Sequence, residues 1–427
     1  MKFLHCADIH LGKTLGGNKE RYKDFFYAFS RVIKLAIDEK IDFMIMAGDL
    51  FQEGSIAPST LADTIEILEP MKQAKIPIIA IEGNHDLFRR RKDESWLHFL
   101  SRRGYLKLLR PTMHAREGRI EFQPYDEENA VGGWIDINGL RICGIGYYGA
   151  ATNQMLALAL DSLPDKPDIG IFHGGVWHEH ILKLIKFGGV TPDEIMPLKE
   201  HFRYLALGHG HRPYSYGEFA YNPGALEVVN REEANREDGD RGCVYMVEMD
   251  GKNMKVETLY IPRRPYLNIR TDVEGANDFS EVMEKCIAQL KVKKDDPTIN
   301  KRPVLMWDIV GKVNFESYEI DVDRLKQTAM DMLDPIHAEI FNQTSLIRSS
   351  RDYHGESENM DTIFRETILE LIQANPLYRE KSGDILDLIF DLKREVIENK
   401  ENDRDRIIDL IHTRRTKFDE KLQNKQD

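Results

Sequence analysis

From the amino terminus to about residue 260, short runs of apolar residues alternate with longer amphipathic stretches. The amphipathic stretches Tyr22–Glu39 and Ser59–Ala74 have apolar side chains at helical spacing. The short runs are continuously apolar, which is typical of strands that are covered on both faces. Six runs are predicted to be such strands: Phe3–Cys6, Phe43–Ala47, Ile76–Ile81, Arg141–Gly146, Ile169–Phe172 and Tyr204–Leu207. This order of elements predicts a layered α/β fold.

The pattern changes near residue 262. Cys243–Met249 and Val256–Ile261 are predicted to close the first region, and Pro262–Pro265 is predicted to be a linker because its prolines exclude helix and sheet interiors. Beyond the linker we expect a strand, a helix, a second strand and a second helix, at Leu267–Thr271, Asp278–Leu290, Val304–Val310 and Val322–Leu333. These elements predict a small α+β domain.

The last part of the chain is predicted to be a helical tail behind a polar linker. Arg351–Met360 is polar, and Ile368, Leu371 and Ile372 mark a first helix. A second helix is predicted from an apolar stripe at helical spacing, formed by Ile385, Leu388, Ile389, Leu392 and Val396. We therefore divide the chain into residues 1–262, 263–350 and 351–427.

The composition restricts the class of protein. Of the 427 residues, 41% are hydrophobic and 31% are charged, as in soluble globular proteins. Because no apolar run is long enough to span a membrane and no signal peptide is present, we expect a cytoplasmic protein without membrane contact. The net charge of −13 argues against nucleic-acid binding through a broad positive potential, although it permits local binding. Reduced, buried thiols are predicted at Cys6, Cys143, Cys243 and Cys286, which form no close-spaced pair.

Polar motifs follow the predicted strands directly. They are Asp8-Ile9-His10, Gly48-Asp49, Gly83-Asn84-His85-Asp86, His173-Gly174-Gly175 and Gly208-His209-Gly210-His211. Ligand sites assemble at strand ends in α/β sheets, so we expect these side chains to meet. Oxygen and imidazole ligands together suit manganese, iron or zinc better than calcium.

The number of candidate ligands predicts two metal ions. Seven side chains suffice for two ions if one carboxylate is shared, and Asp49 is the natural bridge. Two ions about 3.5–4 Å apart can bind one phosphate and an activated water. His85 is then left to protonate the leaving oxygen or to stabilise charge, and we expect Asp86 to orient it.

With these motifs in this order, the chain resembles the calcineurin-like metallophosphoesterase superfamily. More narrowly, it resembles the SbcD-type nuclease subunit of the DNA double-strand-break repair complex. The narrower resemblance depends on Leu4–Gly12, Ala47–Phe51, Ile81–Asp86, Asn222–Glu227 and Gly239–Gly242, and it covers roughly residues 1–350.

The resemblance implies a metallophosphoesterase sandwich with a small α+β capping domain that binds DNA, and a helical C-terminal tail. It implies one ion held by Asp8, His10, Asp49 and His211, a second held by Asp49, Asn84, His173 and His209, and His85 as the catalytic residue. It also implies manganese as the preferred metal, and DNA exonuclease or endonuclease activity close to the nucleoid. The partners implied are a second copy of the chain and an SbcC-type coiled-coil ATPase, which would bind the C-terminal helices.

One departure from the family pattern concerns activity. The family usually has a histidine three residues after the aspartate of its GD motif, and this chain has Gln52 there. Because that histidine is associated with placing the DNA strand for exonuclease work, the departure predicts weak exonuclease activity with metal binding intact. Ala225, where the family usually has serine, is a milder departure.

Other residues allow more than one interpretation. The basic run Arg89, Arg90, Arg91 and Lys92 leaves the predicted active-site loop, and it is either a DNA-phosphate contact or a solvated face. His178 and His180 lack the helical spacing of a zinc motif, so we interpret them as surface or substrate-loop residues. His5 and His114 are interpreted as structural or exposed. A last set is either core or a dimer-forming face: Leu61, Ile65, Leu68, Trp96, Phe99 and Leu100.

Three functions compete for this sequence. The first is a metal-dependent DNA nuclease, the second is a phosphodiesterase or phosphatase of small molecules with the same site, and the third is a non-catalytic scaffold. The complete set of metal-binding residues disfavours the scaffold. The added domain and the helical tail favour the nuclease, because a small substrate requires neither.

Overall fold

The structure is a computed structural model. It describes residues 1–14, 17–87, 94–114, 117–177, 189–230, 233, 241–251, 253–294, 302–347, 360–373 and 381–398. Contacts divide the chain into two units. Unit 1 contains Met1–Asn268, Pro297–Met306 and Asp334–Ala338, and unit 2 contains Ile269–Asp296, Trp307–Leu333 and the chain from Glu339 onward.

The first sheet of unit 1 has seven strands in the order β17-β16-β1-β2-β3-β4-β7. Their bounds are β1 (Lys2–Cys6), β2 (Phe43–Met46), β3 (Ile78–Ala80), β4 (Lys107–Leu109), β7 (Val131–Gly132), β16 (Val244–Asp250) and β17 (Asn253–Leu259). The strands from β1 to β7 pair in parallel, and β16 and β17 close one edge in antiparallel pairing. The first three strands predicted from the sequence therefore form the centre of one sheet.

The second sheet has six strands in the order β14-β15-β13-β10-β9-β8. Their bounds are β8 (Trp134–Ile137), β9 (Leu140–Ile145), β10 (Ile169–His173), β13 (Tyr204–Gly208), β14 (Tyr214–Tyr216) and β15 (Ala220–Asn222). Here β9, β10, β13 and β15 are parallel. Two small sheets pair β5 (Thr112–His114) with β6 (Arg119–Glu121) and β11 (Gly175–Val176) with β12 (Gly189–Val190).

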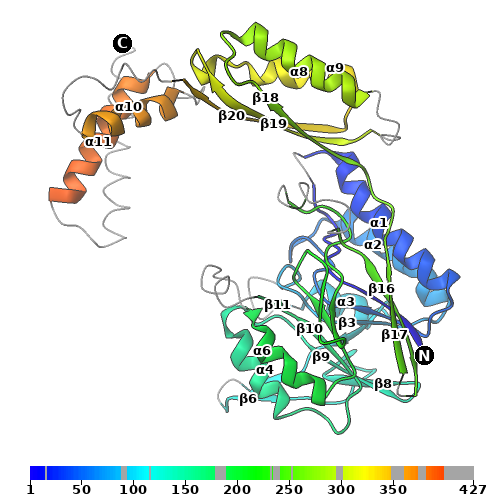
Figure 1. Cartoon of the computed structure of the whole chain (residues 1–427). Helices are drawn as coiled ribbons and strands as arrows, with labels where there is room; N and C mark the ends of the chain where they lie inside the picture. Colours follow the sequence, from blue (N-terminus) through cyan, green and yellow to red (C-terminus); the bar gives the residue numbers. More distant parts are fainter. Residues whose placement is uncertain are drawn as a thin grey trace. The chain divides into compact units, whose positions relative to one another are not determined.

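The two large sheets pack face to face with helices on their outer faces (Figure 1). Phe3 and Phe43 of the first sheet share a buried cluster with Ile171 and Tyr204 of the second. On the outer face of the first sheet lie α1 (Lys19–Asp38), α2 (Pro58–Gln73) and α3 (Trp96–Arg102). The other outer face is covered by α4 (Thr152–Leu160), α6 (Pro192–Ile195) and the 3-10 helix η2 (Met196–Glu200). The predicted layered α/β sandwich is confirmed, and burial on both faces explains the continuously apolar strands.

Helix α1 begins three residues before the predicted start because of its cap. The Asn18 side chain accepts hydrogen bonds from the backbone N–H groups of Glu20 and Arg21, which stabilises the first turn at Lys19. Phe25, Phe29 and Val32 then face the core at helical spacing.

The first turn of α1 is bound to several later segments of unit 1. Arg21 is buried, and its guanidinium donates to Glu227 at 2.7 Å. Arg264, from the predicted linker, donates to Asp24 at 2.7 Å. Arg302 donates to Glu20 at 2.9 Å. The Arg264–Asp24 pair gives the linker a contact with the helix that follows the Asp8–His10 loop.

The α+β region contains a three-stranded sheet in the order β18-β19-β20. Its strands are β18 (Tyr266–Asp272), β19 (Val304–Val313) and β20 (His337–Leu346), with helices α8 (Phe279–Lys294) and α9 (Val322–Leu333) and the short η3 (Ser317–Glu319). Within unit 2, Trp307 is buried and donates to the Thr271 hydroxyl at 2.9 Å. The sequence predicted two of these strands and both helices, and it missed β20.

The tail contains two helices, α10 (Met360–Gln373) and α11 (Ser382–Glu398), which pack together. Ile372 and Leu386 are buried, and Arg365 pairs with Asp387 at 2.5 Å. Leu371 is 66% exposed, so an apolar residue of α10 faces away from this contact. The predicted linker, apart from Met360, and the apolar run Ile407–Ile411 lie outside the described residues.

Two expectations from composition can be compared with the structure. All four cysteines are free and buried, as predicted. Among the residues that the structure describes, no helix is both long and apolar enough to cross a membrane.

Candidate metal centre

The eight side chains named from the sequence come from strand ends of both large sheets. They are Asp8 and His10 after β1, Asp49 after β2, Asn84 and His85 after β3, His173 at the end of β10, and His209 and His211 after β13. The parallel strands of each sheet end at a common edge, so side chains far apart in the sequence become neighbours, such as His10 and His211, which are 201 residues apart.

Asp8, His10 and His211 form what we call the first group. Their ligand atoms all lie within 4.8 Å of one another. The Nε2 atoms of His10 and His211 are 3.1 Å apart, and His211 Nε2 is 3.9 Å from Asp8 Oδ1. Asp8 and His10 are fully buried, so these atoms meet out of bulk water.

Asn84, His173 and His209 form the second group. Asn84 Oδ1 is 3.1 Å from His173 Nε2 and 2.8 Å from His209 Nδ1. Asp49 lies between the two groups, because its Oδ2 is 3.4 Å from His173 Nε2 and 3.9 Å from His10 Nε2. This is the arrangement that a bridging carboxylate requires.

The hydrogen bonds of two histidines test whether metal ions fit. His173 donates from Nδ1 to the Ala47 carbonyl at 2.7 Å, and His211 donates from Nδ1 to Glu233 at 2.6 Å. Each Nε2 therefore faces other acceptor atoms, which is stable only with a proton or a metal ion between them. Two ligands bound about 2.1 Å from one ion lie about 3–3.4 Å apart. The distances from His173 Nε2 to Asn84 Oδ1 (3.1 Å) and to Asp49 Oδ2 (3.4 Å) fall in that range, and the distance from Asn84 Oδ1 to His209 Nδ1 is slightly shorter, at 2.8 Å.

The charge states agree with a cation site. Burial raises the pKa of Asp8 to about 6. For Asp49, burial acts to raise the pKa, but the charge of His173 outweighs it and the pKa falls below its ordinary value. Burial lowers the pKa of His209 to about 3, so this imidazole is neutral and able to bind metal. Burial opposes a charge on His173, yet Asp49 raises its pKa to about 9, and a metal ion would replace that proton.

Backbone strain is concentrated at this site. Asp8, His10, Asp49 and His209 have positive φ angles of 51°, 53°, 54° and 82°, a conformation that costs a non-glycine residue about 1–3 kcal/mol. Gly48 and Gly83 are required because a Cβ there would lie 2.3 Å from His173 Nδ1 and 2.2 Å from Asp49 Oδ1. The fold therefore bends three chain segments sharply, at Asp8–His10, Asp49 and His209, to bring these side chains together.

His85 lies beside both groups and is held by the loop after β2. Its backbone N–H donates to Asp49 Oδ1 at 2.8 Å, and its Nδ1 donates to the Gln52 carbonyl at 2.6 Å. The expectation that Asp86 orients His85 is wrong. The buried Asp86 carboxylate instead accepts from the backbone N–H groups of Gly83 and Phe51, which ties the two loops together.

Two contributors to the site were missed from the sequence. Glu233 positions His211, and it also accepts from the backbone N–H of Val229 at 2.7 Å. Tyr147 lies against the second group, with its ring centroid 5.4 Å from that of His209 and 6.0 Å from that of His173. Tyr147 follows β9 at the same sheet edge as the motifs. Its position directly after the predicted strand Arg141–Gly146 could therefore have identified it as a candidate site residue. Glu233 directly follows none of the predicted strands, so no comparable signal marked it.

Other predicted residues have mixed outcomes. Arg89, Arg90, Arg91, Lys92, His178 and His180 lie outside the described residues. Of the neighbouring cations, Arg102 pairs with Glu94 at 3.2 Å and Arg110 pairs with Glu82 at 3.3 Å. His5 is structural, as interpreted, since it is buried and bonded to the Tyr204 hydroxyl at 2.8 Å.

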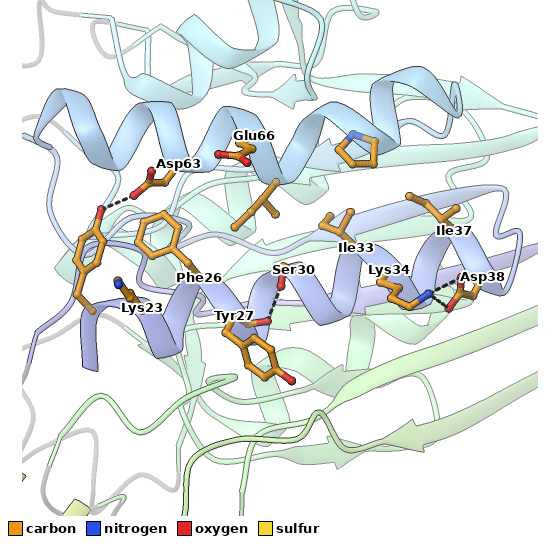
Figure 2. Close-up of a pocket in the computed structure, with 13 residues that line it drawn as sticks. Lys23, Phe26, Tyr27, Ser30, Ile33, Lys34, Ile37, Asp38, Asp63 and Glu66 are labelled. Atoms are coloured by element: carbon orange, nitrogen blue, oxygen red, sulfur yellow. Dashed lines mark hydrogen bonds and ion pairs between the residues drawn. The ribbon is translucent and has the colours of Figure 1, made fainter. Parts of the chain in front are cut away.

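A separate groove of about 690 Å³ lies between α1 and α2 and contains none of the eight side chains (Figure 2). In Figure 2, Phe26, Ile33 and Ile37 of α1 lie along the groove, and Asp63 and Glu66 of α2 lie across it. The groove therefore supplies no ligand to the candidate centre.

Comparisons with a family model and with known proteins agree on one family for this chain. The model of the calcineurin-like phosphoesterase family matches residues 1–236. A protein of Saccharolobus solfataricus named DNA double-strand break repair protein Mre11 is 25% identical over 305 residues, which are 70% of this chain and 74% of the relative. The Mre11 proteins of Archaeoglobus fulgidus and Methanococcus maripaludis are 26% and 23% identical, over 88% and 94% of this chain and 81% and 96% of theirs. Because the family model covers more than half of the 427 residues, the chain belongs to the calcineurin-like phosphoesterase family.

Proposed function

We propose that the chain is a metal-dependent DNA nuclease that hydrolyses phosphodiester bonds at DNA ends during double-strand-break repair. The position of Asp49 supports this most, because its carboxylate lies between two groups of metal-binding side chains. Two ions that share a carboxylate can act on one phosphate. Support for DNA as the substrate comes from the relatives named for double-strand break repair, which align with up to 94% of this chain.

The proposed cofactor is a pair of divalent ions, with manganese first among the candidates. Asp8, His10, Asp49 and His211 would hold one ion, and Asp49, Asn84, His173 and His209 would hold the other. When bound, such a pair polarises the phosphate and lowers the pKa of a bound water. The side chains present supply mixed nitrogen and oxygen ligands, as manganese, iron and zinc accept.

His85 is the proposed catalytic residue. Its Nδ1 donates to the Gln52 carbonyl, so Nε2 is the atom left to hold or release a proton. Its ring centroid is 4.8 Å from that of His10, which keeps this proton close to the first group. We propose that His85 protonates the leaving oxygen of DNA or stabilises charge on the phosphorus.

The proposed assembly has three domains: the nuclease domain of residues 1–262, a DNA-binding cap of residues 263–350, and a linker with an ATPase-binding tail of residues 351–427. We also propose that Arg89–Lys92 contact DNA and that Leu61, Ile65, Trp96 and Phe99 contribute to a homodimer. These four side chains are partly buried against the core of unit 1, which leaves part of each available to a second copy.

The tail is proposed to bind an SbcC-type coiled-coil ATPase, and truncation tests this. A chain ending at Asp352 should fold and hold metal, yet it should no longer co-purify with the ATPase. The exposed Leu371 supports the proposal because a partner would cover it. Unfolding of the truncated chain, or full affinity for the ATPase, would contradict it.

One experiment separates the nuclease from an enzyme for small diesters. The protein with manganese is assayed on linear double-stranded DNA of defined ends and on bis(p-nitrophenyl) phosphate, with Asp49→Asn as the inactive control. We expect cleavage of DNA at micromolar concentrations or below. Efficient cleavage of the small diester without any cleavage of DNA would overturn the nuclease proposal and favour a small-molecule phosphodiesterase.

A further inference from the structure

We propose that Tyr147 is a substrate-positioning residue whose ring holds the base of the nucleotide next to the scissile phosphate, on the side of the second group. This inference rests on the proposed nuclease function and extends it to a named contact. None of the sequence motifs includes Tyr147, and its role follows from where the fold puts it.

The fold fixes Tyr147 at the edge where the candidate centre is built. Strand β9 pairs in parallel with β10, and Ile145 lies opposite Phe172, the residue before His173. The chain that leaves β9 therefore reaches the same edge as His173. There the backbone N–H of Tyr147 donates to the Glu82 carbonyl at 3.2 Å, which ties it to the segment that leads into Asn84.

Tyr147 and its neighbour face opposite ways. Tyr148 packs against the buried cluster under the second sheet, beside α4 and α6. Tyr147 belongs to none of the hydrophobic clusters found among the described residues and remains partly exposed. Its ring instead lies tilted by 33° against His209 and edge-on to His173. Packing of the core therefore explains Tyr148, but it does not explain an aromatic ring at position 147.

An aromatic ring beside a phosphate-cleaving centre has a definite use. The bases of a single strand stack on aromatic side chains, and this binding tolerates any sequence because every base has a π face. One face of the Tyr147 ring is turned to His209, and a base would pack on the part that remains exposed. Such a contact would set the distance of the phosphate from Asn84 and His173 without contributing a ligand.

The test compares three substitutions in the full chain with manganese on a single-stranded oligonucleotide. Tyr147→Phe keeps the ring, Tyr147→Leu keeps most of the volume without aromaticity, and Tyr147→Ala removes both. We expect KM to rise roughly 10-fold for Ala and Leu, which corresponds to the loss of one stacked base, while kcat changes less than about 3-fold. Tyr147→Phe should behave as the wild type. Metal content by elemental analysis should be unchanged in all three.

A matched substrate and a matched control sharpen the result. An oligonucleotide that lacks the base next to the cleaved bond should show no difference between wild type and Tyr147→Ala. Tyr27→Ala removes a tyrosine that is 47% exposed in the α1–α2 groove, and it should change neither kinetic constant.

Several outcomes would overturn the inference. A lost ion in Tyr147→Ala would mean that the ring only supports His209, and an equal loss in Tyr147→Phe would assign the effect to the hydroxyl. An unchanged KM in Tyr147→Ala, with wild type cutting DNA, would refute the Tyr147 contact alone. A wild type that cuts no DNA would refute the proposed function and the contact together.

Discussion

The two groups of the candidate centre share Asp49 but are held in place by different means. In the first group, His211 is oriented by the side chain of Glu233, at 2.6 Å. In the second group, His173 is oriented by the main-chain carbonyl of Ala47, at 2.7 Å. A side-chain partner can be removed by one substitution, whereas a carbonyl at the end of a central strand cannot. The first group is therefore the one in which a single substitution can remove the partner that orients a histidine.

The surroundings of the two groups differ as well. His10 Nδ1 is buried without a hydrogen-bond partner among the described residues. The other two members of the first group are oriented by hydrogen bonds, because His211 donates to Glu233 and Asp8 accepts from the His209 backbone N–H at 3.0 Å. In the second group, Asn84 Oδ1 contacts both histidines, and Tyr147 lies against them. The first group thus depends on Glu233, on the His209 backbone N–H and on packing, whereas in the second group one amide oxygen contacts both histidines beside the Tyr147 ring.

The largest effect is expected where the two groups meet. Asp49→Ala should abolish turnover and lower the content of both ions, because the carboxylate contacts histidines of both groups. Asp49→Asn keeps the shape and can still accept from the His85 backbone N–H, so it separates loss of charge from loss of structure. Elemental analysis and circular dichroism together measure this.

The control for Asp49 is Asp38→Ala, which removes an exposed aspartate paired with Lys34 on α1. It should leave metal content and turnover unchanged. An Asp49→Ala protein that still holds two ions per chain would show that Asp49 does not bridge them. The two groups would then be separate metal sites.

The next effect concerns His85, the proposed proton donor. His85→Ala should keep both ions and normal DNA affinity while the rate falls about 10²–10⁴-fold, the usual contribution of general acid–base catalysis. Single-turnover rates, with DNA binding measured separately, test this. His114→Ala is the control, since His114 is bonded to Glu121 at 2.8 Å on a strand outside the site. A near-normal rate in His85→Ala would show that His85 is not catalytic.

A third prediction separates the two groups. Glu233→Ala should weaken the first ion about 10–100-fold, as is typical when the partner of a metal-bound histidine is removed. Asn84→Ala should weaken mainly the second ion because it removes a ligand atom. Glu233→Gln keeps an acceptor for His211 Nδ1–H and should fall between wild type and Glu233→Ala. Calorimetric titration with manganese resolves the two affinities, and equal weakening of both ions by Glu233→Ala would contradict the asymmetry.

Much of the fold was predictable because its strands are buried on both faces. Phe3–Cys6 and Tyr204–Leu207 are continuously apolar, and the structure has strands there. Strand β20 was missed because its residues His337–Leu346 are mostly half-exposed and include six polar or charged side chains, so no apolar run marks it. Hydrophobic patterning therefore finds central strands and overlooks strands with a solvated face.

The residues of the candidate site also differ in how well the sequence predicts them. Side chains that directly follow a buried strand, such as Asp49 and His173, were predictable because strand ends meet at one edge. Glu233 was not, since it follows no predicted strand or motif and its contact with His211 exists only in the folded chain. Asp86 was assigned the wrong partner because chain adjacency to His85 says nothing about side-chain direction in a tight loop.

The smallest effect is expected at Gln52, whose backbone links the Leu11 segment to His85. Its N–H donates to the Leu11 carbonyl at 3.0 Å, and its carbonyl accepts from His85 Nδ1 at 2.6 Å. Its side-chain oxygen is buried without a partner among the described residues. Gln52→His should therefore leave both backbone contacts and the metal content unchanged. It should replace an amide oxygen that accepts no hydrogen bond from the described residues with an imidazole N–H that can donate one. One hydrogen bond to a charged phosphate is worth about 1.5 kcal/mol, so exonuclease activity on linear DNA should rise roughly 10-fold or less. Gln52→Asn, which adds no imidazole, should show no rise. If the wild type already degrades linear DNA rapidly, or if Gln52→Asn gains as much as Gln52→His, then the side chain at position 52 does not limit exonuclease activity.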